Sequence, residues 1–579
     1  MASAAWFRRW SLRGSRSSGG KPRRSASGQP PRLEVLESRL LPSLTPHLLR
    51  DINPGAGSSN PSQFVEVKGT AFFAATDPVH GTELWKSNGT PAGTVLVRDI
   101  DPGSASSSPT LLTNVNGTLF FEATDPTHGR ELWKSNGTAA GTVLVRDIWV
   151  GPVSNYGAWL TNVNGTLFLS ADDGPHGSEL WKSNGTPAGT VMVRDIHPGG
   201  YGSNPSYLTN VNGTLFFQAN NGVNGAELWK SNGTPAGTVM VRDIHPGPSS
   251  SSPKFLINVN GVVFFQANDG VHGVEVWKSN GTAAGTSLLK DIHPGVNGSN
   301  PVHFTTAYGV LSFAADDGVH GLEPWISNGT TAGTILLKDI NPGAGSGLST
   351  LYPAVGSPII RGVGFFAANN GVSGFELWKS NGSAAGTVLV KDIRAGTLGS
   401  NPSNLTNVNG TLFFSANNGV NGVELWMSNG TAAGTLLIKD IDPGSASSNP
   451  SFLTNINNTL FFTANDGVHG VEPWVLGPVP LATDASATPS EAMSPGSVDA
   501  ALVSAPQAPH PTGSTTSSTG SGPTATENFA VRSVVTDGDS GTVTKAGVSD
   551  GGARSARAFH TPTPQNDSLA RVAPWGDDL

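Results

Sequence analysis

Residues 111–148 read LLTNVNGTLFFEATDPTHGRELWKSNGTAAGTVLVRDI, and close copies of this text fill about three quarters of the 579-residue chain. A tryptophan two positions after a glutamate marks each copy, and successive marks are 48, 48, 48, 48, 48, 53, 48 and 48 residues apart. A fixed period of about 20–50 residues indicates a solenoid, a propeller or an array. The nine marking residues are Trp85, Trp133, Trp181, Trp229, Trp277, Trp325, Trp378, Trp426 and Trp474.

Each copy contains four short apolar runs separated by turn signals. In the quoted copy the runs are 111–115, 119–121, 131–134 and 142–148. Asn116-Gly117 separates the first two and favours a type I′ hairpin, because both residue types tolerate positive φ. Asp-Ile-x-Pro-Gly text ends the last run in most copies, since proline cannot continue a strand ladder. With no helical period, the unit is predicted to be four antiparallel strands.

Four strands in about 48 residues is the size of a propeller blade. Residues 47–52 match the last strand of a unit, whereas the final unit stops at 476, before its own last strand. We therefore predict an all-β, nine-bladed β-propeller over residues 47–477, closed by the N-terminal strand, which removes both sheet edges. An open solenoid would need distinct polar caps, which we do not find. Two stacked smaller rings are a further alternative, but neither would close as neatly.

The segments outside the repeats differ in composition from them. Residues 1–32 carry eight basic residues and no acid, and residues 478–579 are rich in Ser, Thr, Pro, Ala and Gly. We predict a disordered basic arm over 1–46 and a disordered tail over 478–579. The 53-residue interval carries five extra residues between Ile340 and Phe365, which we place in the connection between two blades.

The composition excludes several classes of function. The chain has no cysteine, so it has no disulfide framework, thiolate metal site or cysteine nucleophile. No apolar stretch is long enough for a transmembrane helix. A net charge of -8 gives no overall case for nucleic acid. No nucleophile elbow, phosphate loop or HExxH motif is present.

The text ELWKSNGTAAGT at 131–142 resembles the bacterial ELWxxDGT repeat family. The resemblance implies a secreted or surface protein without an established common activity. Residues 32–43, RLEVLESRLLPS, resemble a segment near the start of many predicted exported proteins of planctomycete bacteria, which implies export. The aspartate of the family motif is replaced here by Asn88, Asn136, Asn184, Asn232, Asn280, Asn328, Asn381 and Asn429.

Several residue types recur at the blade period. We expect the glutamates before tryptophan and the aspartates before the last isoleucine to pair across strands with Lys or Arg. A ring of carboxylates binding cations is the alternative. The Asp/Asn-Gly-Val-His-Gly text before each Glu-x-Trp is interpreted as a tight turn, with calcium binding as the alternative. The histidines in it are too far apart along the chain for one zinc centre. They are His80, His128, His176, His272, His320 and His469.

The nine repeat tryptophans are interpreted as packing between blades, with exposed stacking platforms for sugars as the alternative. Near-identical blades offer no local catalytic constellation, so we predict no catalytic residue and no cofactor, and Ca²⁺ stays an open alternative. The best candidates for ligand contact break the symmetry: Trp149, Tyr156, Trp159 and Tyr352. We predict an exported, non-enzymatic scaffold that binds an extracellular glycan or protein. A polysaccharide lyase or hydrolase with its site at the asymmetric loops, and a structural surface spacer, are the alternatives.

Overall fold

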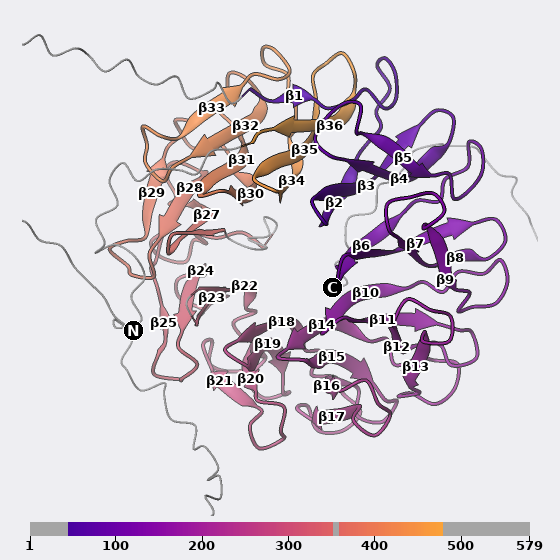
Figure 1. Cartoon of the computed structure of the whole chain (residues 1–579). Coiled ribbons are helices and arrows are strands. Elements are labelled where there is room, and N and C mark those ends of the chain that lie inside the picture. Colours follow the sequence, from indigo (N-terminus) through magenta and orange to yellow (C-terminus); the bar gives the residue numbers. More distant parts are fainter. Residues whose placement is uncertain (1–44, 308, 351–357, 479–579) are drawn as a thin grey trace, which may run out of the picture. The chain divides into compact units, whose positions relative to one another are not determined.

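A computed structural model describes residues 45–307, 309–350 and 358–478. These residues form nine four-stranded sheets arranged in a ring, as Figure 1 shows, so the prediction of a nine-bladed β-propeller is confirmed. The described part of the chain contains no helix that is long and apolar enough to span a membrane. The arm over 1–44 and the tail over 479–579 lie outside the described residues, and their predicted disorder stays a prediction.

Each blade is a meander of consecutive antiparallel strands, with the first strand innermost in the ring and the fourth outermost (Figure 1). Blades one to three contain β2 (Ser62–Val67), β3 (Thr70–Asp77), β4 (Gly81–Ser87), β5 (Val95–Arg98); β6 (Thr110–Val115), β7 (Thr118–Asp125), β8 (Gly129–Ser135), β9 (Val143–Arg146); β10 (Ala158–Val163), β11 (Thr166–Asp172), β12 (Ser178–Ser183), β13 (Val191–Arg194). Blades four to six contain β14 (Ser206–Val211), β15 (Thr214–Asn220), β16 (Ala226–Ser231), β17 (Val239–Arg242); β18 (Lys254–Val259), β19 (Val262–Asn268), β20 (Val274–Ser279), β21 (Ser287–Lys290); β22 (Val302–Ala307), β23 (Val310–Asp316), β24 (Leu322–Ser327), β25 (Thr334–Leu336). Blades seven to nine contain β26 (Ile359–Ile360), β27 (Val363–Asn369), β28 (Phe375–Ser380), β29 (Val388–Lys391); β30 (Ser403–Val408), β31 (Thr411–Asn417), β32 (Val423–Ser428), β33 (Leu436–Lys439); β34 (Ser451–Ile456), β35 (Thr459–Asn465), β36 (Val471–Leu476) and β1 (His47–Leu48).

The ninth blade is completed by the N-terminal strand, as the phase of the repeats predicts. β1 pairs antiparallel with β36, and the Leu49 N–H donates to the Pro473 carbonyl at 2.8 Å. Leu49 and Ile52 are buried in a cluster with Phe64 and Trp85 of blade one. The strand is shorter than the predicted 47–52, because Pro473 of β36 has no N–H to continue the ladder, and the Ile52 N–H bonds to the Glu472 carboxylate.

Apolar side chains fill the interfaces between blades. Phe120 of blade two packs with Leu167, Leu169 and Trp181 of blade three, and equivalent clusters recur around the ring. The repeat tryptophans are each only 4–6% exposed. Their interpretation as packing between blades is therefore confirmed, and they are not exposed sugar platforms.

The meander gives the ring two different faces. One face, which we call the hairpin face, holds the hairpins between first and second strands and the Asn-Gly-Thr loops between third and fourth strands. Asn116 and Gly117 have φ values of 50° and 79°, as the predicted type I′ turn requires. The other face, which we call the linker face, holds the turns between second and third strands and the linkers between blades.

Blade seven departs from the pattern. Its first strand β26 has two residues, whereas the first strand of every other blade has six. The extra residues of the 53-residue interval precede β26, and residues 351–357, among them Tyr352, lie outside the described residues.

Candidate functional site

The recurring glutamates anchor the linkers. Glu179 is fully buried, and its carboxylate accepts hydrogen bonds from the Ile196 N–H at 3.0 Å, the Ser203 N–H at 2.8 Å and the Ser203 hydroxyl at 2.6 Å. Burial raises its pKa, while these hydrogen bonds act in the opposite direction. The expected pairing of these glutamates with Lys or Arg is therefore wrong. The ion pairs found among the described residues join aspartate to histidine in turns.

The Lys and Arg residues before the recurring aspartates contact the tryptophan of the next blade instead of a carboxylate. The Lys290 ammonium lies 5.3 Å from the centroid of the Trp325 ring and donates to the Thr334 carbonyl at 2.7 Å. A cation over an aromatic face is attracted by the ring quadrupole. The carboxylates thus bond to linker N–H groups, whereas the cations cover the next blade's tryptophan.

Replacing one anchoring glutamate should measurably destabilise the ring. In Glu227→Gln one acceptor oxygen becomes an N–H₂ group facing the Ile244 N–H, the Ser251 N–H or the Ser251 hydroxyl. We expect a loss of about 1–3 kcal/mol in the free energy of unfolding, the cost of a buried unsatisfied donor. Urea unfolding followed by tryptophan fluorescence measures it. Glu66→Gln is not a suitable control, because the half-buried Glu66 accepts a hydrogen bond from the Gly69 N–H. Lys254→Gln is the control, and equal effects of Glu227→Gln and Lys254→Gln would contradict the anchoring role.

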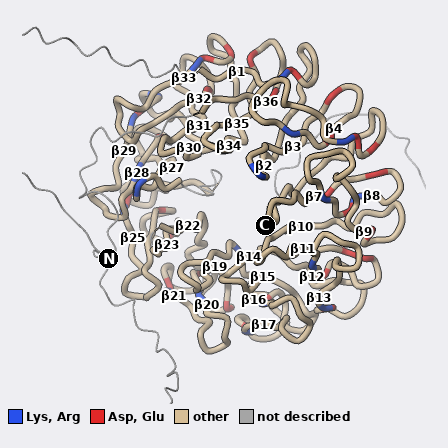
Figure 2. The backbone as a smooth tube through the Cα atoms, in the orientation of Figure 1, with Lys and Arg blue, Asp and Glu red and all other residues tan. Residues whose placement is uncertain are grey.

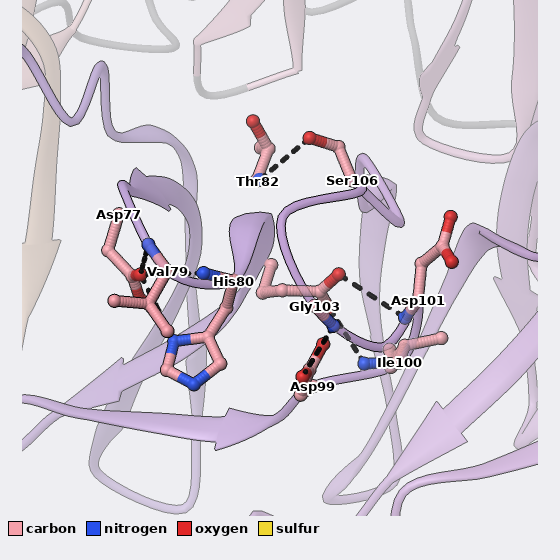
Figure 3. A network of polar contacts seen from close by, with 10 residues as sticks. Asp77, Val79, His80, Thr82, Asp99, Ile100, Asp101, Gly103 and Ser106 are labelled. Atoms are coloured by element: carbon pink, nitrogen blue, oxygen red, sulfur yellow. Dashed lines mark hydrogen bonds and ion pairs between the residues drawn. The ribbon is translucent and has the colours of Figure 1, made fainter.

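A local side chain accepts the backbone hydrogen bonds of the turns between second and third strands. In blade five Asp269 accepts from the Val271 and His272 N–H groups at 2.9 Å, and its other oxygen contacts His272 Nδ1 at 2.7 Å. Figure 3 shows the equivalent Asp77, Val79 and His80 of blade one. In blade four Asn221 and Asn224 replace the Asp–His pair and keep the same backbone bonds. Turn formation therefore accounts for the recurring Asp and His. Among the described residues no three His, Asp or Glu side chains gather closely enough to hold a metal.

The pairing should be visible in the titration of the histidine. The hydrogen bond that His272 donates to Asp269 raises the pKa of His272, so the pair stabilises the fold below pH 6.5 and loses this contribution as the pH rises through the higher folded-state pKa. We expect Asp269→Asn to lower the pKa of His272, measured by NMR of the ring nitrogens. His320, in another blade, should keep its own raised pKa in the same variant. An unchanged His272 titration would contradict the role of the aspartate.

Exposed apolar side chains concentrate on the linker face. Of the seventeen large apolar side chains that are exposed among the described residues, thirteen lie in its turns and linkers. Tyr156 and Tyr201 are 72% and 84% exposed. The thirteen are Val79, Val150, Val153, Tyr156, Tyr201, Val223, Val271, Val296, Val319, Val372, Leu398, Val420 and Val468.

The candidate ligand-contact residues predicted from the sequence lie in different parts of the structure and do not form one site. The Trp149 ring covers Gly174 in the neighbouring turn, where a Cβ would fall 2.9 Å from it. In the next blade His197 covers Gly222 in the same way, so Trp149 has a packing role. Tyr156 projects from the linker, and Trp159 lies on the innermost strand β10. Tyr352 lies outside the described residues.

Trp159 belongs to a set of positions that sequence reasoning missed, which we call the inner rim. It is the second residue of each described six-residue first strand, at a bulge where two residues face one on the neighbouring strand; in blade four Ser206 pairs with Gln218 but Thr209 pairs with Phe216. All eight inner-rim residues have φ between 52° and 59°. They are Gln63, Leu111, Trp159, Tyr207, Phe255, His303, Asn404 and Phe452. Their identity varies strongly inside an otherwise constant repeat, and that variation was the available signal.

A continuous run of aromatic rings extends from the inner rim of blades three to five to Phe304, the neighbour of His303 in blade six. Trp159 and Tyr207 have ring centroids 4.7 Å apart, Tyr207 and Phe255 5.9 Å, and Phe255 and Phe304 6.4 Å. Beyond it, a cavity of about 440 Å³ has Phe313 and His303 among its described lining residues. We call Trp159, Tyr207 and Phe255 the aromatic arc.

A second departure from symmetry lies between blades two and three. Glu122 is fully buried, neither carboxylate oxygen has a hydrogen-bond partner, and burial raises its pKa to about 8, with nearby Arg130 acting in the opposite direction. Gly157 makes room for it, because a Cβ there would fall 2.2 Å from Glu122 Oε1. Proline occupies the position of Gly157 in the linkers of seven blades, at Pro61, Pro109, Pro205, Pro253, Pro301, Pro402 and Pro450.

Comparisons with known proteins support no identification. No model of a known protein family matches the sequence, and no curated protein is similar to it. Solved structures with some likeness include a puromycin hydrolase mutant complexed with PGG, at 13% identity and a TM-score of 0.32, covering 62% of this chain and 59% of that one. A prolyl oligopeptidase B from Galerina marginata matches at 9% identity and a TM-score of 0.34, covering 64% and 55%. The chain thus spans less than two thirds of these proteins, and at such scores the likeness carries nothing about activity.

Proposed function

We propose that this propeller is an exported, non-enzymatic binding scaffold whose linker face contacts an extracellular glycan or protein. The observation that carries the proposal is the concentration of exposed apolar side chains on that face. Contiguous exposed apolar surface marks interaction sites on soluble proteins. The export-like residues 32–43 support a place at the cell surface or outside the cell.

A binding role also agrees with how the recurring acids are used. The repeat glutamates are buried and bond to linker N–H groups, and the turn aspartates cap their own loops. These carboxylates hold backbone in place and are not poised toward an open cleft. The repeat thus supplies a rigid frame, and the variable residues on it supply recognition.

Cell fractionation and a binding screen test the proposal together. The native protein is expected in the extracellular or surface fraction, and the purified full chain is expected to bind a surface glycan or protein. Tyr201→Ser on the linker face should weaken binding, whereas Ile335→Ser on the outermost strand β25 should not, although Ile335 is also exposed, at 48%. A cytoplasmic location, or blank glycan and protein screens, would overturn the proposal.

A further inference from the structure

We propose that the aromatic arc is a carbohydrate subsite, in which a neutral sugar chain lies along Trp159, Tyr207 and Phe255. This inference rests on the proposed binding function and names its ligand class and its contact residues. The arc residues differ from the repeat tryptophans, which are buried between blades and cannot contact a ligand.

The first argument is geometric. The three rings come from the innermost strands of three successive blades, and each ring touches the next, with centroids 4.7 and 5.9 Å apart. Phe255 is 41% exposed although it is a phenylalanine, and Trp159 and Tyr207 are partly exposed. The arc therefore offers a row of aromatic surface that follows the curve of the ring. The apolar C–H faces of successive pyranose units pack well on such a row.

The second argument comes from the backbone. Bulky residues rarely adopt positive φ, and the left-handed conformation costs about 1–2 kcal/mol for an L-residue. Trp159, Tyr207 and Phe255 have φ values of 57°, 55° and 55°, where glycine would be free of this cost. The second residue of each of these strands lies at a bulge, and bulges commonly re-aim a side chain beside a functional site. Strained residues of this kind cluster at ligand sites.

The third argument is the contrast with the other inner-rim residues. Gln63 accepts from the Leu112 N–H, His303 contacts the Ser349 carbonyl, and Asn404 donates to the Pro450 carbonyl, so these three bond to the backbone of the next blade. Phe255 has no polar group with which to do so. Phe452 of blade nine is also exposed, at 47%, so what distinguishes Trp159, Tyr207 and Phe255 is that each ring touches the next.

The fourth argument is the charge of the surroundings, which selects a neutral ligand. The linkers 149–157, 197–205 and 245–253 and strands β10, β14 and β18 contain one lysine, two histidines and no Arg, Asp or Glu. Figure 2 shows the charged residues mainly toward the outside of the ring. Ser, Thr and Asn are frequent in these segments, and such side chains supply adaptable hydrogen bonds beside aromatic anchors. An acidic polysaccharide would find almost no cations here.

The test uses the full chain and glycine substitutions, because glycine keeps the left-handed backbone. Binding of cellohexaose, xylohexaose, mannohexaose and polygalacturonate is measured by calorimetry for wild type, Trp159→Gly and Phe255→Gly. Leu111→Gly and Phe452→Gly are matched controls at the same strand position in blades two and nine. We expect a neutral hexaose to bind wild type and to bind both arc variants about tenfold or more weakly, the loss typical of one stacking contact. The controls should bind as wild type does, and thermal unfolding should show all four variants folded.

The outcomes separate this inference from the proposed function. If a neutral glycan binds wild type and the arc variants equally, the subsite is wrong and the scaffold function stands. Preference for polygalacturonate overturns the neutral ligand. If no glycan binds but a purified surface protein binds and requires the linker face, the carbohydrate subsite falls and the scaffold remains. If nothing binds, both fall.

Discussion

Deleting residues 1–52 is expected to open the ring and cost more than about 5 kcal/mol in the free energy of unfolding. The deletion removes β1 and the buried Leu49 and Ile52, each of which contributes about 1.5–3 kcal/mol by burial. It also leaves the Glu472 carboxylate without the Ile52 N–H, and stranding a buried charge is costly. Strand β36 becomes an exposed edge, which invites association between chains. Denaturant unfolding and light scattering should show a lower midpoint and oligomers.

The matched control is deletion of residues 1–44, which stops just before the described residues. This shorter variant should unfold like the full chain and stay in the same association state. A synthetic peptide of residues 45–52 should restore part of the stability of the longer deletion by filling the vacant strand position. A 53–579 protein that unfolds at the wild-type midpoint would contradict closure by the N-terminal strand.

The buried Glu122 should make the protein less stable as the pH rises from about 4.5 to about 8. Its pKa is raised from 4.5 to about 8, so the folded state holds the proton more tightly than the unfolded state. The stabilising effect is complete below pH 4.5, is lost progressively up to pH 8, and changes no further above it. A shift of this size corresponds to about 5 kcal/mol. Urea unfolding between pH 4 and 9 should show the loss, and Glu122→Gln should reduce it.

Two comparisons isolate the contribution of Glu122. Glu131, whose pKa burial also raises to about 8, stays in the Glu122→Gln variant and should leave a residual slope of similar size. Gly157→Ala should destabilise the wild type, because the new Cβ meets the carboxylate, and should destabilise Glu122→Ala much less. Identical pH profiles of wild type and Glu122→Gln would show that the carboxyl is not the group responsible.

The sequence was sufficient for the ring because period and phase are properties of the whole chain. The nine repeat tryptophans indicated the number of blades. A last-strand sequence at 47–52, before the first full unit, and its absence after residue 476 indicated the closing strand. Asn116-Gly117 gave its turn type, since few residue pairs tolerate two positive φ values. The hairpin text itself varies, with Lys68-Gly69 in blade one and Arg361-Gly362 in blade seven, but both residues keep positive φ there.

The contacts between blades could not be obtained in the same way. Glu179 was expected to meet Lys or Arg across strands, but its partners are the Ile196 and Ser203 groups of the following linker. Sequence spacing does not say which backbone N–H groups a buried carboxylate will reach. The aromatic arc was missed because Trp159 was grouped with Trp149 by nearness in the chain, whereas its neighbour in space is Tyr207, one full repeat later.

The contact between Glu122 and Gly157 marks one position in the ring as different from all the others. Nearly identical blades could in principle stack in the wrong order or exchange between molecules during folding. Seven linkers carry a proline where Gly157 stands, and ring atoms at that point would collide with the Glu122 carboxylate. Blade two therefore has room for blade three, whose linker carries Gly157, whereas a blade whose linker carries proline at this position would clash with Glu122. This one interface therefore distinguishes blades two and three from the others and fixes the order of the blades, although the other interfaces between blades are almost identical.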